Sequence, residues 1–134
     1  MKQIRNFNSV GEAKEAANMA QYILNVLKGS KPQPFMQNGH LMMTERLRQF
    51  WTWGAHSFKY IAATDGCVGL QMLVSGMKHR GRVRVYYNYG TDTFDVELIR
   101  ARKDEAVKEF SDVYLDELQR ILHENIERDD DMKL

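Results

Sequence analysis

Hydrophobic residues recur at every second position between His56 and Arg102, and turn signals divide this stretch into four short runs. Such alternation is typical of half-buried β-strands. The connecting turns, at 65–66, 79–81 and 90–92, are so short that consecutive strands must be antiparallel neighbours. The stretch therefore predicts a four-stranded antiparallel β-meander, with the alternating apolar residues Phe58, Tyr60 and Ala62; Leu70, Met72 and Val74; Val83, Val85, Tyr87 and Tyr89; and Phe94, Val96 and Leu98.

The alternation also predicts the register between the third and fourth strands. Their apolar residues have odd numbers in one strand and even numbers in the other. Both sets must face the same core, because a slip by one residue would expose one of them. The opposite face is expected to be partly solvated, with cross-strand charge pairs that favour the pairing by about 0.2–1 kcal/mol each. That face carries Arg82, Arg84, Tyr86, Asn88, Asp95 and Glu97.

A first helix is predicted over about residues 10–28. Ser9 and Glu12 have the spacing of a capping box, and an apolar stripe with helical period follows them. Gly29 suits the left-handed position that often follows a helix. The next stretch, 29–39, is predicted to be a surface loop, because it contains Pro32, Pro34 and Asn38-Gly39.

Two further helices are predicted around the strands. Residues 41–53 favour a short helix capped by Thr44 and ended by Gly54, with the start of a strand as the alternative. A helix of about 24 residues is predicted to begin near Lys103, with acidic residues in its first turn. It would measure roughly 36 Å, whereas a strand of seven residues spans about 23 Å. We therefore expect its end to overhang the sheet. That end is either exposed to solvent or packed against another surface, such as a second copy of the chain.

These elements predict a single α+β domain over residues 1–134. An N-terminal helix, a short second helix and a long C-terminal helix are expected to pack on one face of the four-stranded meander. Residues 129–134 are polar and are expected to form a frayed tail.

The composition indicates a soluble cytoplasmic protein without a membrane partner. The net charge is only +1, which argues against a chain dominated by electrostatic binding to nucleic acid or to a membrane surface. A single cysteine, Cys67, cannot form an internal disulfide. The first ten residues lack the apolar stretch of a secretory signal, and no apolar run is long enough to span a bilayer.

No pattern in the sequence indicates a catalytic residue, a metal site or a cofactor. Cys67 would need His56 or His79 beside it, and nothing in the sequence determines that geometry, so a small apolar role is favoured. The four histidines lack the spacing of metal ligands. His79, in a turn, and His123, late in a helix, are expected to be solvated. The remaining enzyme hypothesis is one in which the catalytic residues are dispersed along the chain.

Asp95 and Glu97 point the same way from the fourth strand, and paired carboxylates can bind a metal or act as acid and base. The metal-nuclease pattern requires a lysine at the position of Ile99, so it is not met. The neighbouring Arg82 and Arg84 explain the two carboxylates as members of a charge ladder.

The one basic cluster of the sequence leads into an aromatic residue. Basic side chains interleaved with aromatic rings on a sheet can bind a single strand of nucleic acid. This surface is the alternative functional hypothesis, and a solvated hairpin is the competing structural interpretation. It comprises Lys78, His79, Arg80, Arg82, Arg84 and Tyr86.

Large hydrophobic residues provide the leading hypothesis, a non-enzymatic binding module that forms a homodimer. Phe50, Trp51 and Trp53 can line a ligand cleft or an interface, although closing one end of the core is the favoured role. Phe110 and Leu118 lie on the expected overhanging helix and are candidates for a dimer interface.

Residues 58–66 read Phe-Lys-Tyr-Ile-Ala-Ala-Thr-Asp-Gly, residues 83–88 read Val-Arg-Val-Tyr-Tyr-Asn, and residues 92–98 read Asp-Thr-Phe-Asp-Val-Glu-Leu. This order resembles small uncharacterised proteins of bacteriophages and bacterial mobile elements, which carry a similar strand followed by a hairpin ending in Asp-x-aromatic-Asp-Val-Glu. The resemblance covers residues 58–98. It implies an accessory protein of a phage or bacterium, and it brings no catalytic residue with it.

Overall fold

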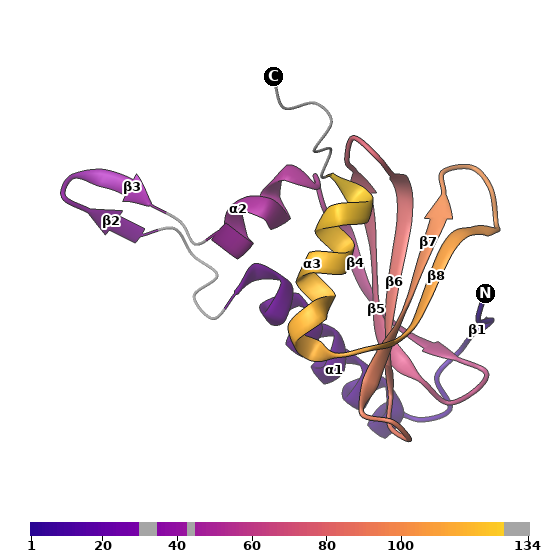
Figure 1. The fold of residues 1–134 in the computed structure, drawn as a ribbon. Coiled ribbons are helices and arrows are strands. Elements are labelled where there is room, and N and C mark those ends of the chain that lie inside the picture. Colours follow the sequence, from indigo (N-terminus) through magenta and orange to yellow (C-terminus); the bar gives the residue numbers. More distant parts are fainter. Residues whose placement is uncertain (30–34, 43–44, 128–134) are drawn as a thin grey trace.

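The computed structural model describes residues 1–29, 35–42 and 45–127, which adopt an α+β fold (Figure 1). One antiparallel sheet has the strand order β1-β4-β5-β6-β7-β8, and a separate β2-β3 hairpin projects from the body of the molecule. The element bounds are β1 Ile4–Arg5, α1 Val10–Lys28, β2 Phe35–Gln37, β3 His40–Met42, α2 Glu45–Thr52, β4 His56–Ala63, β5 Val68–Ser75, β6 Arg80–Asn88, β7 Thr93–Arg100, β8 Ala106–Val113 and α3 Leu115–Ile126.

The predicted meander is confirmed, because β4 to β7 cover the four alternating runs in sequence order. The register of β6 and β7 pairs Val83 with Leu98 and Val85 with Val96. All four side chains are buried in the main core. The odd-numbered and even-numbered apolar sets therefore share one face, as their alternation predicted.

The sheet has six strands rather than the predicted four. β1 adds to one edge, where it pairs with only the last two residues of β4, and β8 adds to the other edge beside β7. The predicted long C-terminal helix is therefore wrong in its first half: residues 106–113 form β8, and α3 contains only 12 residues.

The physical reason is the open edge of β7. Val107, Phe110 and Val113 also fit a helical stripe, but β-branched and aromatic side chains suit a strand. Pairing with β7 satisfies backbone groups that would otherwise leave that edge open. The predicted overhang disappears with the long helix, and with it the helix surface that was expected to carry a dimer.

The first helix is confirmed at both ends. The Ser9 hydroxyl accepts a hydrogen bond from the backbone N–H of Glu12 at 3.1 Å, and Gly29 follows the helix with φ +93°. The Glu12 carboxylate binds the guanidinium of Arg5 at 2.6 and 2.7 Å and accepts from the backbone N–H of Asn8. The guanidinium of Arg5 lowers the pKa of Glu12 to about 2. This pair connects β1 with α1.

The short second helix is confirmed as α2, whereas the end of the predicted surface loop forms β2 and the turn of the β2-β3 hairpin. Asn38 and Gly39 have φ +52° and +77°, and this left-handed pair forms the two-residue turn between β2 and β3. From the sequence, this dipeptide predicted only a loop. Thr44, Pro32, Pro34 and residues 129–134 lie outside the described residues.

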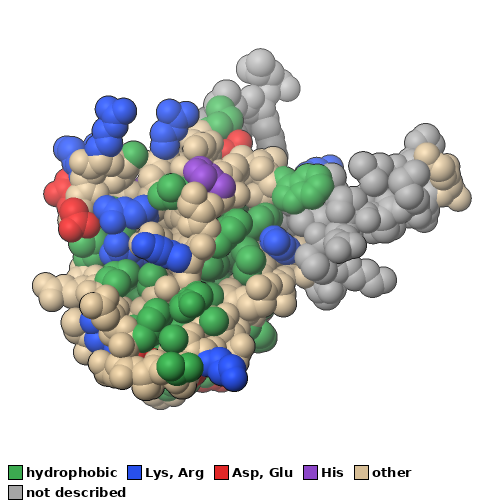
Figure 2. Space-filling model, turned by 180° about the vertical axis from the view of Figure 1, so that it is seen from behind, with side chains coloured by type: hydrophobic (Ala, Val, Ile, Leu, Met, Phe, Trp, Pro, Cys, Tyr) green, Lys and Arg blue, Asp and Glu red, His purple; other side chains and the backbone are tan. Residues whose placement is uncertain are grey.

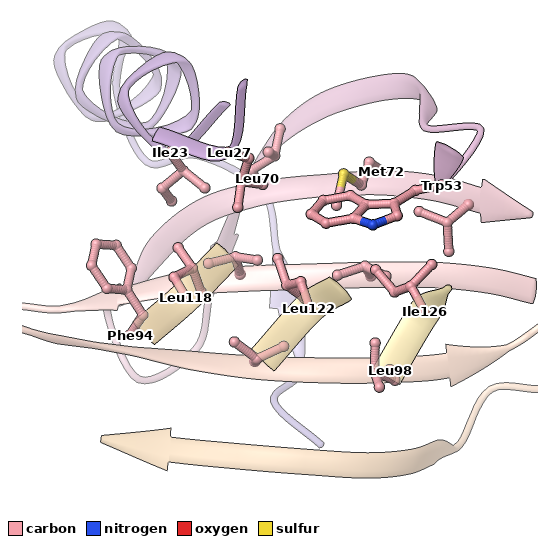
Figure 3. Packing of buried hydrophobic residues seen from close by; sticks show 14 of the residues in the cluster. Ile23, Leu27, Trp53, Leu70, Met72, Phe94, Leu98, Leu118, Leu122 and Ile126 are labelled. Atoms are coloured by element: carbon pink, nitrogen blue, oxygen red, sulfur yellow. The ribbon is translucent and has the colours of Figure 1, made fainter. Parts of the chain in front are cut away.

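All three helices contribute to one core on the same face of the sheet (Figure 3). Leu118, Leu122 and Ile126 of α3 point toward the sheet, and Trp53, just after α2, lies beside them. The indole N–H of Trp53 donates to His123 Nδ1 of α3 at 3.0 Å. The His123 ring, predicted to be solvated, therefore helps to hold two elements together. None of the helices in the described residues combines the length and apolar composition needed to cross a bilayer.

Candidate ligand-binding groove

A groove lies between α1, the β6–β7 turn and the start of α3. Its main hollow has a volume of about 800 Å³, within the range of about 300–1,000 Å³ that is typical of ligand pockets. A second hollow of about 410 Å³ continues it along α1. We call the two together the tyrosine groove; it is lined by Gly11, Lys14, Glu15, Asn18, Met19, Tyr22, Val26, Tyr87, Tyr89, Asp92, Phe94, Tyr114, Leu115 and Asp116.

α1 forms one wall of the groove with a stripe beside its buried face. Met19, Tyr22 and Val26 follow one another at spacings of three and four residues, so they share one side of the helix. Met19 and Val26 are half-buried, and Tyr22 is 47% exposed. The residues that α1 buries lie on the adjacent stripe and are Ala16, Ala20, Ile23 and Leu27.

Two tyrosines at the end of β6 bind carboxylates at the rim of the groove. Tyr87 Oη donates to Asp92 Oδ1 at 2.5 Å, and Tyr89 Oη donates to Glu15 on α1. The two rings pack edge to face, with centroids 4.8 Å apart. The hydrogen bond to Asp92 raises the pKa of Tyr87, and burial together with Glu15 raises the pKa of Tyr89 to about 12. Both phenols therefore stay protonated at neutral pH.

The charged residues around the groove are mainly acidic. Glu15, Asp92 and Asp116 line it, and Lys14 is the one cationic residue among the described residues that do so. The N-terminus of α3 would by itself favour an anion through the helix dipole. Asp116 and Glu117 already occupy its first turn, so carboxylates of the chain supply the negative charge there. The groove as a whole favours a cation.

The opposite face of the sheet holds a buried polar cluster, which corrects the prediction of a partly solvated face there. Tyr86 is fully buried, and Arg84 and Glu97 are 6% and 3% exposed. Arg84 Nε donates to Gln71 Oε1 at 2.8 Å, and Arg84 Nη1 lies 4.0 Å from Glu97 Oε1. The chain before β1 covers these side chains, since the backbone N–H of Lys2 donates to Glu97 Oε2 at 2.5 Å.

The ammonium of Lys2 extends this cluster. It forms an ion pair with Asp65 and lies 3.3 Å from Asp95 Oδ2. Burial lowers the pKa of Lys2, but hydrogen bonds to these two carboxylates more than offset that effect and raise it above its ordinary value. Burial raises the pKa of Glu97, and the N–H of Lys2 offsets only part of this rise. The cluster fastens the N-terminal segment to the sheet.

The structure separates the six residues of the predicted basic surface. Arg84 and Tyr86 belong to the buried cluster. His79, predicted to be solvated, is also buried, and its Nε2 donates to the carbonyl oxygen of Arg82 at 3.2 Å. Burial lowers the pKa of His79, so its ring is neutral at neutral pH. Half of the predicted surface is therefore inaccessible to a nucleic acid.

The other three basic residues do not form a stripe. Arg82 is bound to the carbonyl oxygen of Lys103 and to Asp104 Oδ1, at 3.0 and 3.2 Å. Lys78 and Arg80 are exposed. On the side of the molecule seen in Figure 2, several Lys and Arg side chains lie at the upper left beside acidic ones, and hydrophobic side chains cover the centre. This arrangement gives the nucleic-acid hypothesis little support.

Four of the five residues considered for an interface or ligand cleft belong to the core. Phe50, Trp53 and Leu118 are buried, and Phe110 is half-buried and packs against the same cluster. Trp51, by contrast, is 51% exposed on α2. The aromatic residues clustered just before Gly54 therefore mainly close one end of the core, which was the role favoured from the sequence.

The candidate reactive groups are held in structural contacts. Cys67 is buried, and burial together with Asp65 raises the pKa of its thiol to about 11, so little thiolate exists at neutral pH. His56 is exposed, and its Nδ1 lies 2.9 Å from the carbonyl oxygen of Gly54. Among the described residues, no three His, Cys, Asp or Glu side chains gather as a metal site would require.

No pattern in the sequence indicates that Tyr22, Asp92, Tyr114 and Asp116 belong to one site. They come from α1, the β6–β7 turn and the start of α3, which are far apart in the chain. One local signal was present, namely the second apolar stripe of α1 beside its buried stripe. Comparison of the chain with protein-family models, with curated proteins and with solved structures gave no match.

Proposed function

We propose that this protein is a non-enzymatic binding module that takes its ligand in the tyrosine groove. The observation that supports this proposal most strongly is a hollow of about 800 Å³ with a mainly apolar lining, several tyrosines and few charged groups. Exposed apolar residues gathered in this way are typical of interaction sites. The proposal includes a cytoplasmic location and the accessory role in a phage or bacterium that the resemblance of residues 58–98 implies.

The state of the reactive groups supports binding rather than catalysis. Cys67 carries a protonated thiol at neutral pH, and Asp95 is bound to Lys2. Tyr87 and Tyr89 are neutral phenols whose hydrogen bonds are directed to carboxylates. Such groups provide shape and hydrogen bonding, whereas a general acid or base needs a pKa near the working pH.

A neutral apolar dye tests this function. N-phenyl-1-naphthylamine, whose fluorescence rises in apolar surroundings, should bind the wild-type protein saturably at one site. Tyr22→Ala removes a ring from the point where the two hollows meet, so we expect the dissociation constant to rise about fivefold or more, as for the loss of an aromatic contact. The measurement is a fluorescence titration.

Trp51→Ala is the matched control. The Trp51 side chain is 51% exposed, close to the 47% of Tyr22, but it lies on α2 outside the tyrosine groove. Its loss should leave the affinity for the dye unchanged. The proposal is wrong if the dye fails to saturate one site, or if both variants weaken its binding equally.

We also propose, as a second function, that the chain forms a homodimer through the free edge of β4. β1 pairs only with Ala62 and Ala63, so residues 56–61 have no outer neighbour among the described strands. Phe58 and Tyr60 on this edge are 41% and 46% exposed. An open hydrophobic edge favours pairing with another strand, and a two-fold axis would join two copies of it.

Light scattering tests the dimer. The wild-type protein should have twice its monomer mass at low and at high salt. Tyr60→Lys places a charge on the edge, which natural edge strands use to prevent pairing, and should yield monomers. Val107→Lys, on the opposite edge strand β8, where the wild-type side chain is 40% exposed, should stay dimeric. A monomeric wild-type protein would rule the dimer out.

A further inference from the structure

We infer that the tyrosine groove receives an extended peptide segment of a partner protein, in which basic side chains alternate with apolar ones. This inference rests on the proposed function and adds to it the chemical class of the ligand. It depends on the length of the groove, on its charge and on its aromatic lining.

The length of the groove suits a peptide. The two hollows share Met19 and Tyr22, and together their α1 lining runs from Gly11 to Val26. Fifteen steps along a helix span about 22 Å. An extended chain advances about 3.3 Å per residue, so about seven residues fit along this wall. A small molecule would fill only part of it.

The charge of the groove selects a basic segment. Glu15 on α1, Asp92 in the β6–β7 turn and Asp116 at the start of α3 line the groove, and Lys14 is the one cationic residue among the described lining residues. The chain as a whole has a net charge of +1, so this acidic character belongs to the groove and not to the entire molecule. Complementary charge directs association and excludes acidic segments.

The lining recognises both kinds of side chain in such a segment. Met19, Val26, Phe94 and Leu115 provide apolar contacts in the main hollow. Tyr22, 47% exposed, and Tyr114, 60% exposed, offer ring faces on which a guanidinium can rest. Alternating side chains of an extended peptide point to opposite sides, so its apolar residues can enter the hollow while basic residues reach the rim.

A pair of peptides tests the inference. The first is a capped heptapeptide, Gly-Leu-Arg-Leu-Arg-Leu-Gly, and the second carries citrulline, a neutral isostere, in place of both arginines. Calorimetry and displacement of N-phenyl-1-naphthylamine give their affinities. We expect the arginine peptide to bind at least about tenfold more tightly than the citrulline peptide, because only it can pair with the carboxylates.

Two protein variants locate the effect. In Asp92→Asn/Asp116→Asn the preference for arginine over citrulline should fall below about threefold. Asp104→Asn/Glu105→Gln removes the same charge from the β7–β8 connection, outside the groove, and should keep the full preference.

The outcomes separate the two proposals. Equal binding of both peptides, or equal loss in both double variants, would overturn the inference. N-acetyl-arginine amide that binds as tightly as the heptapeptide would also overturn it, since the site would then belong to a small cation. Dye binding without peptide binding contradicts this inference alone, whereas failure of both probes contradicts the proposed function.

Discussion

Arg84→Met is expected to destabilise the protein by about 3–5 kcal/mol at pH 8, because it leaves the carboxylate of Glu97 buried without its cationic neighbour. Both side chains are almost fully buried, and Arg84 Nη1 lies 4.0 Å from Glu97 Oε1. Gln71 Oε1 also loses the N–H that it accepts from Arg84. Urea unfolding at a series of pH values measures the effect.

The loss should shrink as the pH falls. Burial raises the pKa of Glu97 in the folded protein, so the folded state holds a proton on this group at pH values where the unfolded chain has released it. Its contribution to stability is therefore full below the ordinary pKa of a glutamate and is lost as the pH rises through the raised pKa. The N–H of Lys2, the N-terminal ammonium and Arg84 oppose that rise in the wild-type protein, so removing Arg84 should strengthen this pH dependence.

The double variant Arg84→Met/Glu97→Gln is the control. Without an ionisable group at position 97, the difference in unfolding free energy from the Glu97→Gln single variant should no longer depend on pH. A loss in Arg84→Met that is the same at pH 5 and pH 8 would contradict the buried-charge explanation.

Leu118→Ala should cost about 2–5 kcal/mol of unfolding free energy, the usual range when a buried leucine is truncated in a core. Leu118 is fully buried, and Figure 3 shows it pointing from α3 toward the sheet near Phe94. The main chain around it is held by α3 and the strands, so the space left by the side chain closes only in part. Urea unfolding of the variant measures this cost.

Trp51→Ala distinguishes the core from the surface. Trp51 is larger than Leu118, but it is 51% exposed, so we expect its truncation to change the free energy of unfolding by less than about 1 kcal/mol. If Leu118→Ala instead changed only the solution mass and left the unfolding free energy unaltered, Leu118 would be an interface residue and its assignment to the core would be wrong.

Patterns within a few residues predicted much of this fold. The Ser9 cap and Gly29 bounded α1, and two-residue alternation placed β4 to β7 and the register between β6 and β7. These features depend on backbone geometry and on which side of a strand or helix a residue occupies. Both are properties of short segments, so neighbouring residues carry the information.

The apolar residues of 106–113 follow helical spacing, yet this segment forms β8, because pairing with the open edge of β7 outweighed the local pattern. The burial of Arg84 and Glu97 was likewise decided elsewhere, by the segment around Lys2 that crosses their face. Spacing along one strand carries no information about a distant segment that covers it.

The sequence by itself determined the first helix, the meander and the side of the meander that forms the core. Only the tertiary structure decided the two added strands, the buried ion pair and the tyrosine groove. Tyr22 and Tyr114 illustrate the physical reason: each is an ordinary exposed residue in its own segment. They form one site because the packing of α1 and α3 on the same sheet brings distant parts of the chain together.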